Sequence, residues 1–283
     1  MSLTAVVKKP VIVILFYLLL LAPLAIIAIF KATFEVHVAA PPAPISLPDF
    51  SVYKDVQQKK QAFYEYLLPR ILRANQQLLN DRSSLLSPFT ALSELKRICF
   101  LYARDCDVID VDKKLQLLSR IDIIPPSLAL AQAAMESGWG SSRFARQGFN
   151  LFGHWCFTKG CGLVPRYREK GSVHEVKIFA SPLASVRAYF LNLNTHPRYR
   201  QLRQQRLLIR MQGHDVTGMD LVGFLGSYSQ RGQDYIDEIE QMLIYNKLEA
   251  TADDPFWFVA ESYLAMPALP KLLQVKSPLM LRN

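Results

Sequence analysis

The chain has 283 residues, of which 51% are apolar, and a formal net charge of +9. This length and this share of apolar residues are sufficient for a buried core in one large domain or in two modest ones. The positive charge predicts a polyanionic partner, and the export predicted below excludes nucleic acid from that class.

Residues 11–30 predict a membrane-spanning helix. They read VIVILFYLLLLAPLAIIAIF and contain no charged side chain. At about 1.5 Å per helical residue the segment spans roughly 30 Å, the hydrocarbon thickness of a bilayer. Because Lys8 and Lys9 precede it, residues 1–10 are expected in the cytoplasm and the body of the protein on the far side. We expect an uncleaved signal-anchor. The alternative is a signal peptide cleaved after residues 38–40, which would release the protein.

The segments that follow differ in composition. Residues 31–52 form a proline-rich linker that predicts an extended spacer. Residues 53–114 predict a helical extension, with one helix over 53–80 broken at Pro69, one from Pro88 to Tyr102 and one near 110–119. We place the functional domain at 115–250, with a further helix at 182–195, and a tail at 251–283.

An arginine-rich stretch, PRYRQLRQQRLLIR, contributes much of the positive charge. Its helical spacing puts leucines on one face and arginines on the other. A solvated helix face is the simpler interpretation. Contact with an acidic substrate or lipid head groups is the alternative. The arginines are Arg198, Arg200, Arg203, Arg206 and Arg210.

The most informative stretch begins at Pro125-Pro126, which suit the first turn of a helix. An apolar, alanine-rich helix follows and carries one carboxylate, Glu136, at its expected end. Partial burial there would favour the protonated form, so that Glu136 acts as a general acid near neutral pH. A surface Glu in a salt bridge is the alternative.

The segment AQAAMESGWGSSRFARQGFNLFGHWCFTKGCGLVP resembles the glucosaminidase domain of glycoside hydrolase family 73, and more closely its Bax-type branch in Gram-negative bacteria. The resemblance extends over about 115–247. It implies a mainly α (α+β) fold, in which a lysozyme-like helical lobe faces a small β-hairpin lobe at 162–179. It also implies cleavage of β-1,4 bonds beside N-acetylglucosamine (GlcNAc) in peptidoglycan, with Glu136 as the acid and without a cofactor.

The resemblance also suggests the remaining site residues. A second carboxylate is usual in glycoside hydrolases. Glu175 is preferred over Glu169, although one family position falls near Arg166. Without a second acid, the substrate's 2-acetamido group would act as nucleophile. Tyr228 would bind the N-acetyl group or orient water, with core packing as the alternative. The expected substrate-binding residues are Trp139, Arg143, Asn150, Phe152 and Tyr235.

Four cysteines fall in two close pairs, Cys99 with Cys106 and Cys156 with Cys161. In an exported protein such pairs predict disulfides. A zinc site that combines the second pair with His154 and His174 is the rival interpretation.

The expected function is therefore a peptidoglycan hydrolase anchored in the bacterial inner membrane, with its catalytic domain in the periplasm. Its expected partners are glycan strands and inner-membrane lipid, and the oligomeric state is open. Two alternatives are a lytic transglycosylase on the same fold and a non-catalytic glycan-binding module.

Overall fold

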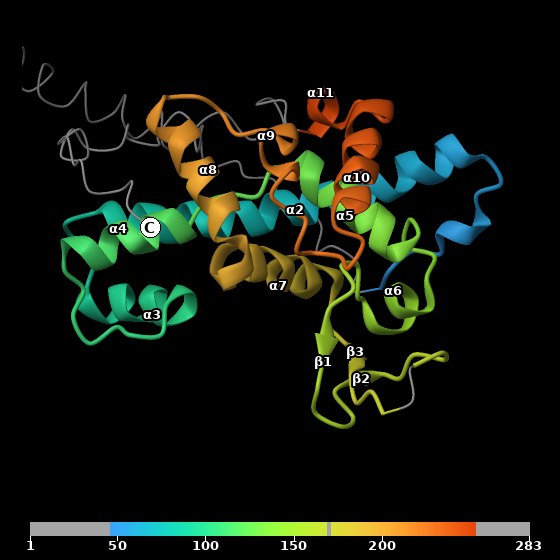
Figure 1. Ribbon diagram of the computed structural model, residues 1–283, viewed down its shortest axis with the longest axis horizontal. Coiled ribbons are helices and arrows are strands. Elements are labelled where there is room, and N and C mark those ends of the chain that lie inside the picture. The colour runs from blue at the N-terminus through green and yellow to red at the C-terminus, as the bar shows by residue number, and fades with distance from the viewer. Residues whose placement is uncertain (1–45, 169–170, 253–283) are drawn as a thin grey trace, which may run out of the picture. The chain divides into compact units, whose positions relative to one another are not determined.

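A computed structural model gives the structure of residues 46–168 and 171–252 (Figure 1). The expected signal-anchor at 11–30, most of the linker and all but the first two residues of the tail lie outside these ranges. Among the helices of the described part, none is both long and apolar enough to cross a bilayer.

The longest element, α2, spans Val56–Leu86 and is capped by Asp55, whose side chain accepts a hydrogen bond from the Gln58 amide. The predicted break at Pro69 is wrong, because α2 runs through this residue without interruption. Phe63, Leu67 and Ile71 are fully buried on either side of it. Packing of this apolar face outweighs the hydrogen bond that proline removes.

Shorter helices flank α2. The 3₁₀ helix η1 (Phe50–Val52) precedes it, and α3 (Leu92–Tyr102) and α4 (Val111–Arg120) follow. The helix predicted near 110–119 is thus confirmed. The one predicted from Pro88 begins four residues later, at Leu92. The Cys99–Cys106 disulfide forms as predicted and closes the loop after α3.

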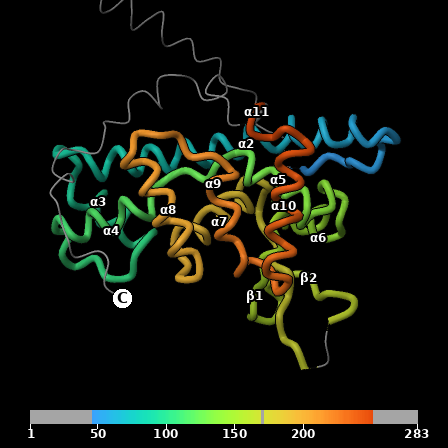
Figure 2. Tube along the Cα trace, turned by 45° about the horizontal axis from the view of Figure 1, so that its top comes forward, coloured from blue at the N-terminus to red at the C-terminus, as the bar shows by residue number. Residues whose placement is uncertain are grey.

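The central helix is α5 (Pro126–Ser137), which starts at the double proline as predicted. It packs against α2, α9 (Gly218–Val222), α10 (Gln233–Tyr245) and α11 (Leu248–Ala252). Figure 2 shows α5 near the crossing of α2 and α10. Residues from Ser127 to Ala134 are all buried, as expected for a helix surrounded by neighbours. Helices α2 and α5 share one hydrophobic core with α7 (Pro182–Thr195), the helix predicted at 182–195.

The arginine-rich stretch forms η2 (Pro197–Tyr199) and α8 (Arg200–Met211). The expectation of a solvated arginine face is wrong for Arg203 and Arg206, which are buried. Arg206 donates hydrogen bonds to the carbonyls of Asp122 and Ile123, at 3.1 and 2.8 Å. Arg203 donates to the carbonyls of Leu193 and His196, in the last turn of α7 and just after it. Both arginines thus satisfy carbonyl groups at or beyond helix ends, a role that hydrophobic periodicity does not reveal.

A small three-stranded antiparallel sheet completes the fold, in the order β1 (Trp155–Cys156), β3 (Glu175–Lys177), β2 (Gly162–Leu163). In Figure 1 the strands lie below α6 (Arg143–Gly148). The predicted hairpin corresponds to β2 and β3, but β1 joins them and the strands are shorter than expected. A mainly helical body with one small sheet fits the predicted lysozyme-like α+β fold.

Candidate active site

Glu136 occupies the last turn of α5, where the chain changes direction abruptly. Ser137 ends the helix, and Gly138 caps it in the left-handed conformation with φ of +58°. Trp139 also has φ of +58°, which is unusual for a residue with a side chain. The Ser137 hydroxyl accepts a hydrogen bond from the Gly140 amide and so holds this turn in place. Glu136 is therefore held on a rigid helix end.

The carboxyl group of Glu136 is suited to hold a proton. Burial raises its pKa above the usual value, and a hydrogen bond from Tyr235 and the nearby charge of Arg231 only partly oppose this shift. The Tyr235 hydroxyl donates to Oε1 of Glu136 at 2.9 Å. Burial also raises the pKa of Tyr235, so its hydroxyl stays protonated and keeps donating.

A chain of buried hydrogen bonds orients this tyrosine. Gln132 lies one helical turn before Glu136 and donates its side-chain amide to the Tyr235 oxygen at 2.9 Å. The same Gln132 accepts a hydrogen bond from the Tyr189 hydroxyl. Because the Tyr235 oxygen accepts from Gln132, its own hydrogen is directed at Glu136.

The two oxygens of Glu136 therefore have different surroundings. Oε1 accepts from Tyr235, whereas Oε2 accepts no hydrogen bond from any residue in the described ranges. Oε2 faces Gly153, where an added Cβ would lie only 3.0 Å from it. Gly153 has φ of +68°, a conformation that favours glycine. When Glu136 is protonated, its proton belongs on Oε2, the oxygen left available for proton transfer.

Tyr228 fixes the loop that carries Gly153. Its hydroxyl donates to the Phe152 carbonyl at 2.8 Å, and its ring stacks on Tyr235 with centroids 5.6 Å apart. Phe152 in turn stacks on Tyr189 at 4.1 Å. Phe152 is buried, so its side chain packs in the core beneath the loop.

Asn150 connects this loop to the sheet. Its side-chain amide donates to the carbonyls of His154 and Lys177, at 2.9 and 2.8 Å, and its oxygen accepts from the His154 amide. The side chain is 2% exposed, so these backbone bonds occupy it. Asn150 thus holds the sheet against the helical body.

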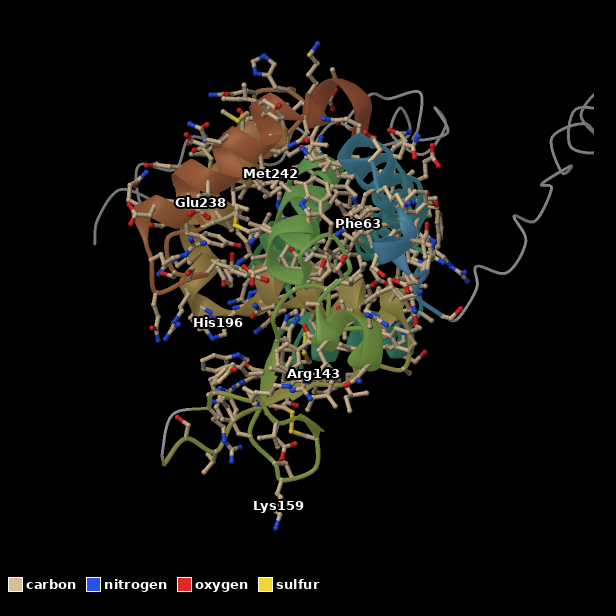
Figure 3. All side chains as sticks on the ribbon, turned by 90° about the vertical axis from the view of Figure 1, so that its right-hand side faces the viewer. Phe63, Arg143, Lys159, His196, Glu238 and Met242 are labelled. Atoms are coloured by element: carbon tan, nitrogen blue, oxygen red, sulfur yellow. A yellow bond between two sulfur atoms is a disulfide. The ribbon has the colours of Figure 1, made fainter. Side chains whose placement is uncertain are left out.

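Among the described residues, no hydrogen bond or ring stacking joins Trp139 or Arg143 to the group formed by Tyr189, Tyr228 and Tyr235. Trp139 packs edge-on against Phe63 and Tyr64 of α2, and the Lys60 ammonium lies 5.0 Å from its ring centroid. The guanidinium of Arg143 donates to the Val164 carbonyl at 2.6 Å, near the point where the sheet meets the helical body (Figure 3). The structure therefore gathers only part of the predicted binding set around Glu136.

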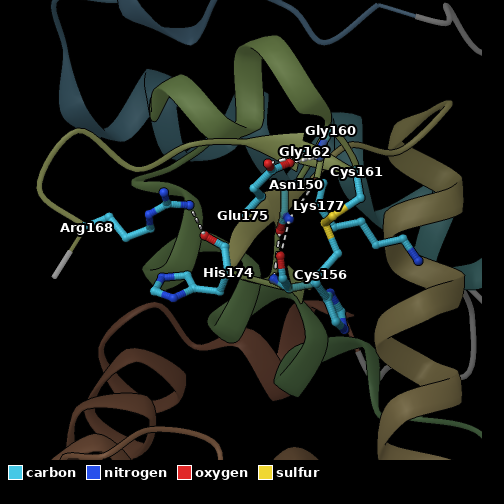
Figure 4. The surroundings of a disulfide bond; sticks show 10 residues. Asn150, Cys156, Gly160, Cys161, Gly162, Arg168, His174, Glu175 and Lys177 are labelled. Atoms are coloured by element: carbon cyan, nitrogen blue, oxygen red, sulfur yellow. Dashed lines mark hydrogen bonds between the residues drawn. A yellow bond between two sulfur atoms is a disulfide. The ribbon is translucent and has the colours of Figure 1, made fainter. Parts of the chain in front are cut away.

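Glu175 belongs to β3 and has the opposite electrostatic environment from Glu136. Its two carboxylate oxygens accept from the backbone N–H groups of Gly160 and Gly162, at 3.0 and 2.8 Å (Figure 4). These bonds lower its pKa. Within residues 46–168 and 171–252, no hydrogen bond or ion pair joins Glu175 to Glu136. Glu169, the other predicted second acid, lies outside these ranges.

The Cys156–Cys161 disulfide forms as predicted, in the loop that Glu175 holds (Figure 4). Among the described residues, Cys156, Cys161 and Glu175 are the one group whose ligand atoms come within 4.8 Å of one another. A zinc site there would need both sulfurs as thiolates, but they are bonded to each other. His174 of the rival zinc set instead stacks on Trp155 at 4.0 Å.

Gln132 and Tyr189 were missed as site residues by the sequence analysis. Both lie on helices with an apolar pattern, where a polar side chain reads as part of the core. Gln132 does carry a signal: it is a buried polar residue four positions before the candidate acid, hence on the same helical face. Tyr189 carries none, because its role depends on how α7 packs against α5.

Comparison with known proteins shows the family of the chain. Residues 112–251 match the family described as mannosyl-glycoprotein endo-beta-N-acetylglucosaminidase, which defines a glycoside hydrolase-type domain. "Protein bax" of Escherichia coli (strain K12) is 34% identical over 200 residues, which cover 67% of this chain and 70% of that protein. No solved structure gives a significant match. The chain belongs to the Bax-type proteins with a glucosaminidase domain, and the predicted resemblance is confirmed.

Proposed function

We propose that the protein hydrolyses β-1,4 bonds of peptidoglycan glycan strands on the GlcNAc side, with Glu136 as general acid. The observation that carries this proposal is the environment of Glu136. Burial raises its pKa, Tyr235 occupies Oε1, and Oε2 is left to protonate the leaving oxygen. General acid catalysis of this kind contributes about 10²–10⁴-fold to a rate.

The nucleophile in this proposal is the 2-acetamido group of the substrate. Its carbonyl oxygen attacks the anomeric carbon as the glycosidic bond breaks, and Glu136 gives its proton to the departing oxygen. Water then attacks the anomeric carbon and opens the cyclic intermediate, giving a proton back to the Glu136 carboxylate. The state of Glu175 supports this route, since two backbone N–H groups already hold its carboxylate. Substrate-assisted glycosidases are a known exception to the two-carboxylate scheme.

Tyr228 and Tyr235 act differently in this mechanism. Tyr235 touches the acid and orients its proton, whereas Tyr228 fixes the Phe152–Gly153 backbone beside it. Trp155 on β1 is 53% exposed, and the ring face that does not stack on His174 offers a surface on which a sugar ring can stack.

Product analysis tests the proposal. Purified sacculi are digested with the full-length protein, and the released fragments are analysed by mass spectrometry. Reducing GlcNAc ends are expected from wild type and none from Glu136→Gln. Release of 1,6-anhydro ends would identify a lytic transglycosylase instead. If the wild type binds sacculi and releases nothing over a range of pH and salt, the protein is a binding module.

The proposal includes the cellular location. Residues 11–30 would anchor the chain in the inner membrane and leave the catalytic domain in the periplasm, next to the glycan. The two disulfides support this location, because such bonds persist in oxidising compartments. Protease added to spheroplasts, whose inner membrane is intact, should degrade the domain. Protection of the whole chain from protease would contradict a periplasmic domain.

A further inference from the structure

A second site lies outside the group of residues around Glu136. A cavity of about 690 Å³ opens between α6 and the segment after β2. Neither Glu136 nor any of the tyrosines around it lines this cavity. Its volume is in the range of small-ligand sites, about 300–1,000 Å³. The lining residues are Arg143, Phe144, Arg146, Gln147, Pro165, Arg166 and Tyr167.

The cavity is strongly positive. Three of its seven lining residues are arginines, and none is acidic. Arg166 makes no hydrogen bond or ion pair with any other residue of the described ranges. Arg143 uses one N–H group on the Val164 carbonyl, which leaves four of its five donors available. Three guanidinium groups around one space repel each other unless an anion lies between them.

One of the three arginines has a partial partner. Hydrogen bonds from Ser51 lower the pKa of Asp49, and the charge of Arg146 adds to that effect. Arg146 is therefore partly neutralised by Asp49. The positive charge that remains for a ligand comes chiefly from Arg143 and Arg166. A guanidinium group pairs with a carboxylate through two parallel hydrogen bonds, which makes carboxylates a well-matched ligand.

The other walls suit a peptide. Tyr167 is 96% exposed, and Pro165 and Phe144 add apolar surface between the charges. A bare inorganic anion would use the arginines and leave these groups without contact. A short acidic peptide uses both, because its carboxylates bind the guanidinium groups while its aliphatic parts cover the rings.

The position of the cavity relates it to the substrate. Arg143 opens α6, which packs against β2, and the chain leaves α6 through the loop whose Gly153 lies against Oε2 of Glu136. The cavity thus lies on the same junction of sheet and helical body as the acid, but displaced from it. A lateral substituent of a bound glycan strand would occupy such a place. In peptidoglycan the lateral substituents are stem peptides, which carry carboxylates.

We propose that the cavity between α6 and β2 binds the carboxylate-bearing stem peptide of peptidoglycan through Arg143 and Arg166. This assignment rests on the proposed function for its substrate, but it concerns binding and not cleavage. The protein would then bind glycan strands that still carry their stem peptides in preference to strands from which the peptides have been removed.

The test measures binding of the full-length protein in the Glu136→Gln background, so that cleavage does not enter. One probe is a pair of sacculus preparations, with stem peptides intact or removed by an amidase. The second is a pair of free stem peptides, with carboxylates free or amidated. Arg166→Gln is the test variant, because Arg166 holds no other residue in place. Arg200→Gln, an exposed arginine on α8, is the control matched in charge.

Arg166→Gln should weaken binding of peptide-bearing sacculi and of the free acidic peptide about tenfold, the effect of one charge-assisted pair. It should leave binding of stripped sacculi unchanged, and Arg200→Gln should change neither. Equal losses in the two variants would indicate non-specific charge attraction and overturn the proposal. So would equal affinity of the parent protein for intact and stripped sacculi, or for free and amidated peptides.

Binding to anionic phospholipid vesicles that Arg166→Gln abolishes would assign the cavity to a head-group phosphate and also overturn the proposal. These outcomes are independent of catalysis. Wild-type protein that releases no fragments but binds in the expected pattern would refute the proposed hydrolase and leave the peptide site standing.

Discussion

Glu136 is partly buried, and Glu175 is buried. The surroundings of these two carboxylates shift their pKa values in opposite directions. Glu136 lies at the end of an apolar helix, where burial exceeds the effect of its one tyrosine partner and raises the pKa. Glu175 lies in a loop whose backbone N–H groups point at it and lower the pKa. Burial alone does not make an acid catalyst. The charged form of Glu136 has one side-chain donor, whereas that of Glu175 has two backbone donors, and this difference sets the direction of each pKa shift.

The largest expected difference between the two carboxylates is in turnover. Glu136→Gln should reduce the rate of glycan cleavage by about 10²–10⁴-fold, because the proposed mechanism assigns proton donation to Glu136 and glutamine has no proton to donate in its place. Glu175→Gln should keep most of the activity, because its role is to hold a loop. Both rates are measured by release of reducing ends from sacculi. A loss in Glu175→Gln as large as that in Glu136→Gln, with the protein still folded, would restore the two-carboxylate mechanism.

The contact between Gly153 and Oε2 gives the next largest effect. In Gly153→Ala the new methyl group meets Oε2 at 3.0 Å and the backbone is strained at φ of +68°. We expect turnover to fall about 10–100-fold, since small misplacements of a reacting group have effects of this size. Gly213→Ala is the matched control, because it has φ of +79° but no atom within 4 Å of the added Cβ. Similar losses in both variants would mean that strain alone is responsible.

The hydrogen bond from Tyr235 predicts a shift in the pH profile. That bond lowers the pKa of Glu136, so Tyr235→Phe should raise it further. The acid must be protonated to act, and the alkaline limb of the activity profile should move to higher pH. The rate at the optimum should fall roughly tenfold, because the proton loses its orientation. Tyr245→Phe, which alters an exposed tyrosine, is the control. An unmoved alkaline limb would contradict the assignment of Glu136 as the titrating acid.

The smallest expected effect is on stability, and its sign differs between the two sites. The folded pKa of Glu136 is raised, so wild type loses stability as pH rises above the ordinary value of 4.5, and Glu136→Gln should be the more stable protein near pH 7. The folded pKa of Glu175 is lowered, so its contribution is present above 4.5 and is lost as pH falls below it. Glu175→Gln should therefore melt below wild type near pH 7, with the gap closing in acid.

Melting curves of the three proteins between pH 3 and pH 8 check this prediction. The sign of each difference from wild type, and its change with pH, is the result that matters. Glu240→Gln, another glutamate of the helical body, supplies the baseline for loss of a carboxylate. Shifts of the same sign in both test variants would contradict the opposite pKa directions.

Prediction from the sequence was most accurate for features that depend on residues close together in the chain. The double proline and the alanine-rich pattern located α5 and its end, and with them Glu136. The cysteine spacing gave both disulfides. Prediction was less accurate for features that depend on packing between segments far apart in the chain. Pro69 was expected to break a helix, yet the buried face of α2 continues through it. Arg203 and Arg206 were expected at the surface, yet they satisfy backbone carbonyls of other segments.

By itself, then, the sequence determined the family, the mainly helical fold and the position of one acid at a helix end. Tertiary structure alone decided which side chains surround that acid. Tyr235 lies 99 residues from Glu136 along the chain, and the Tyr189–Gln132 bond spans 57 residues. Helical periodicity and capping describe neighbours within one or two turns. The pKa of a carboxyl group depends on burial and hydrogen bonds supplied by elements that meet it only after folding.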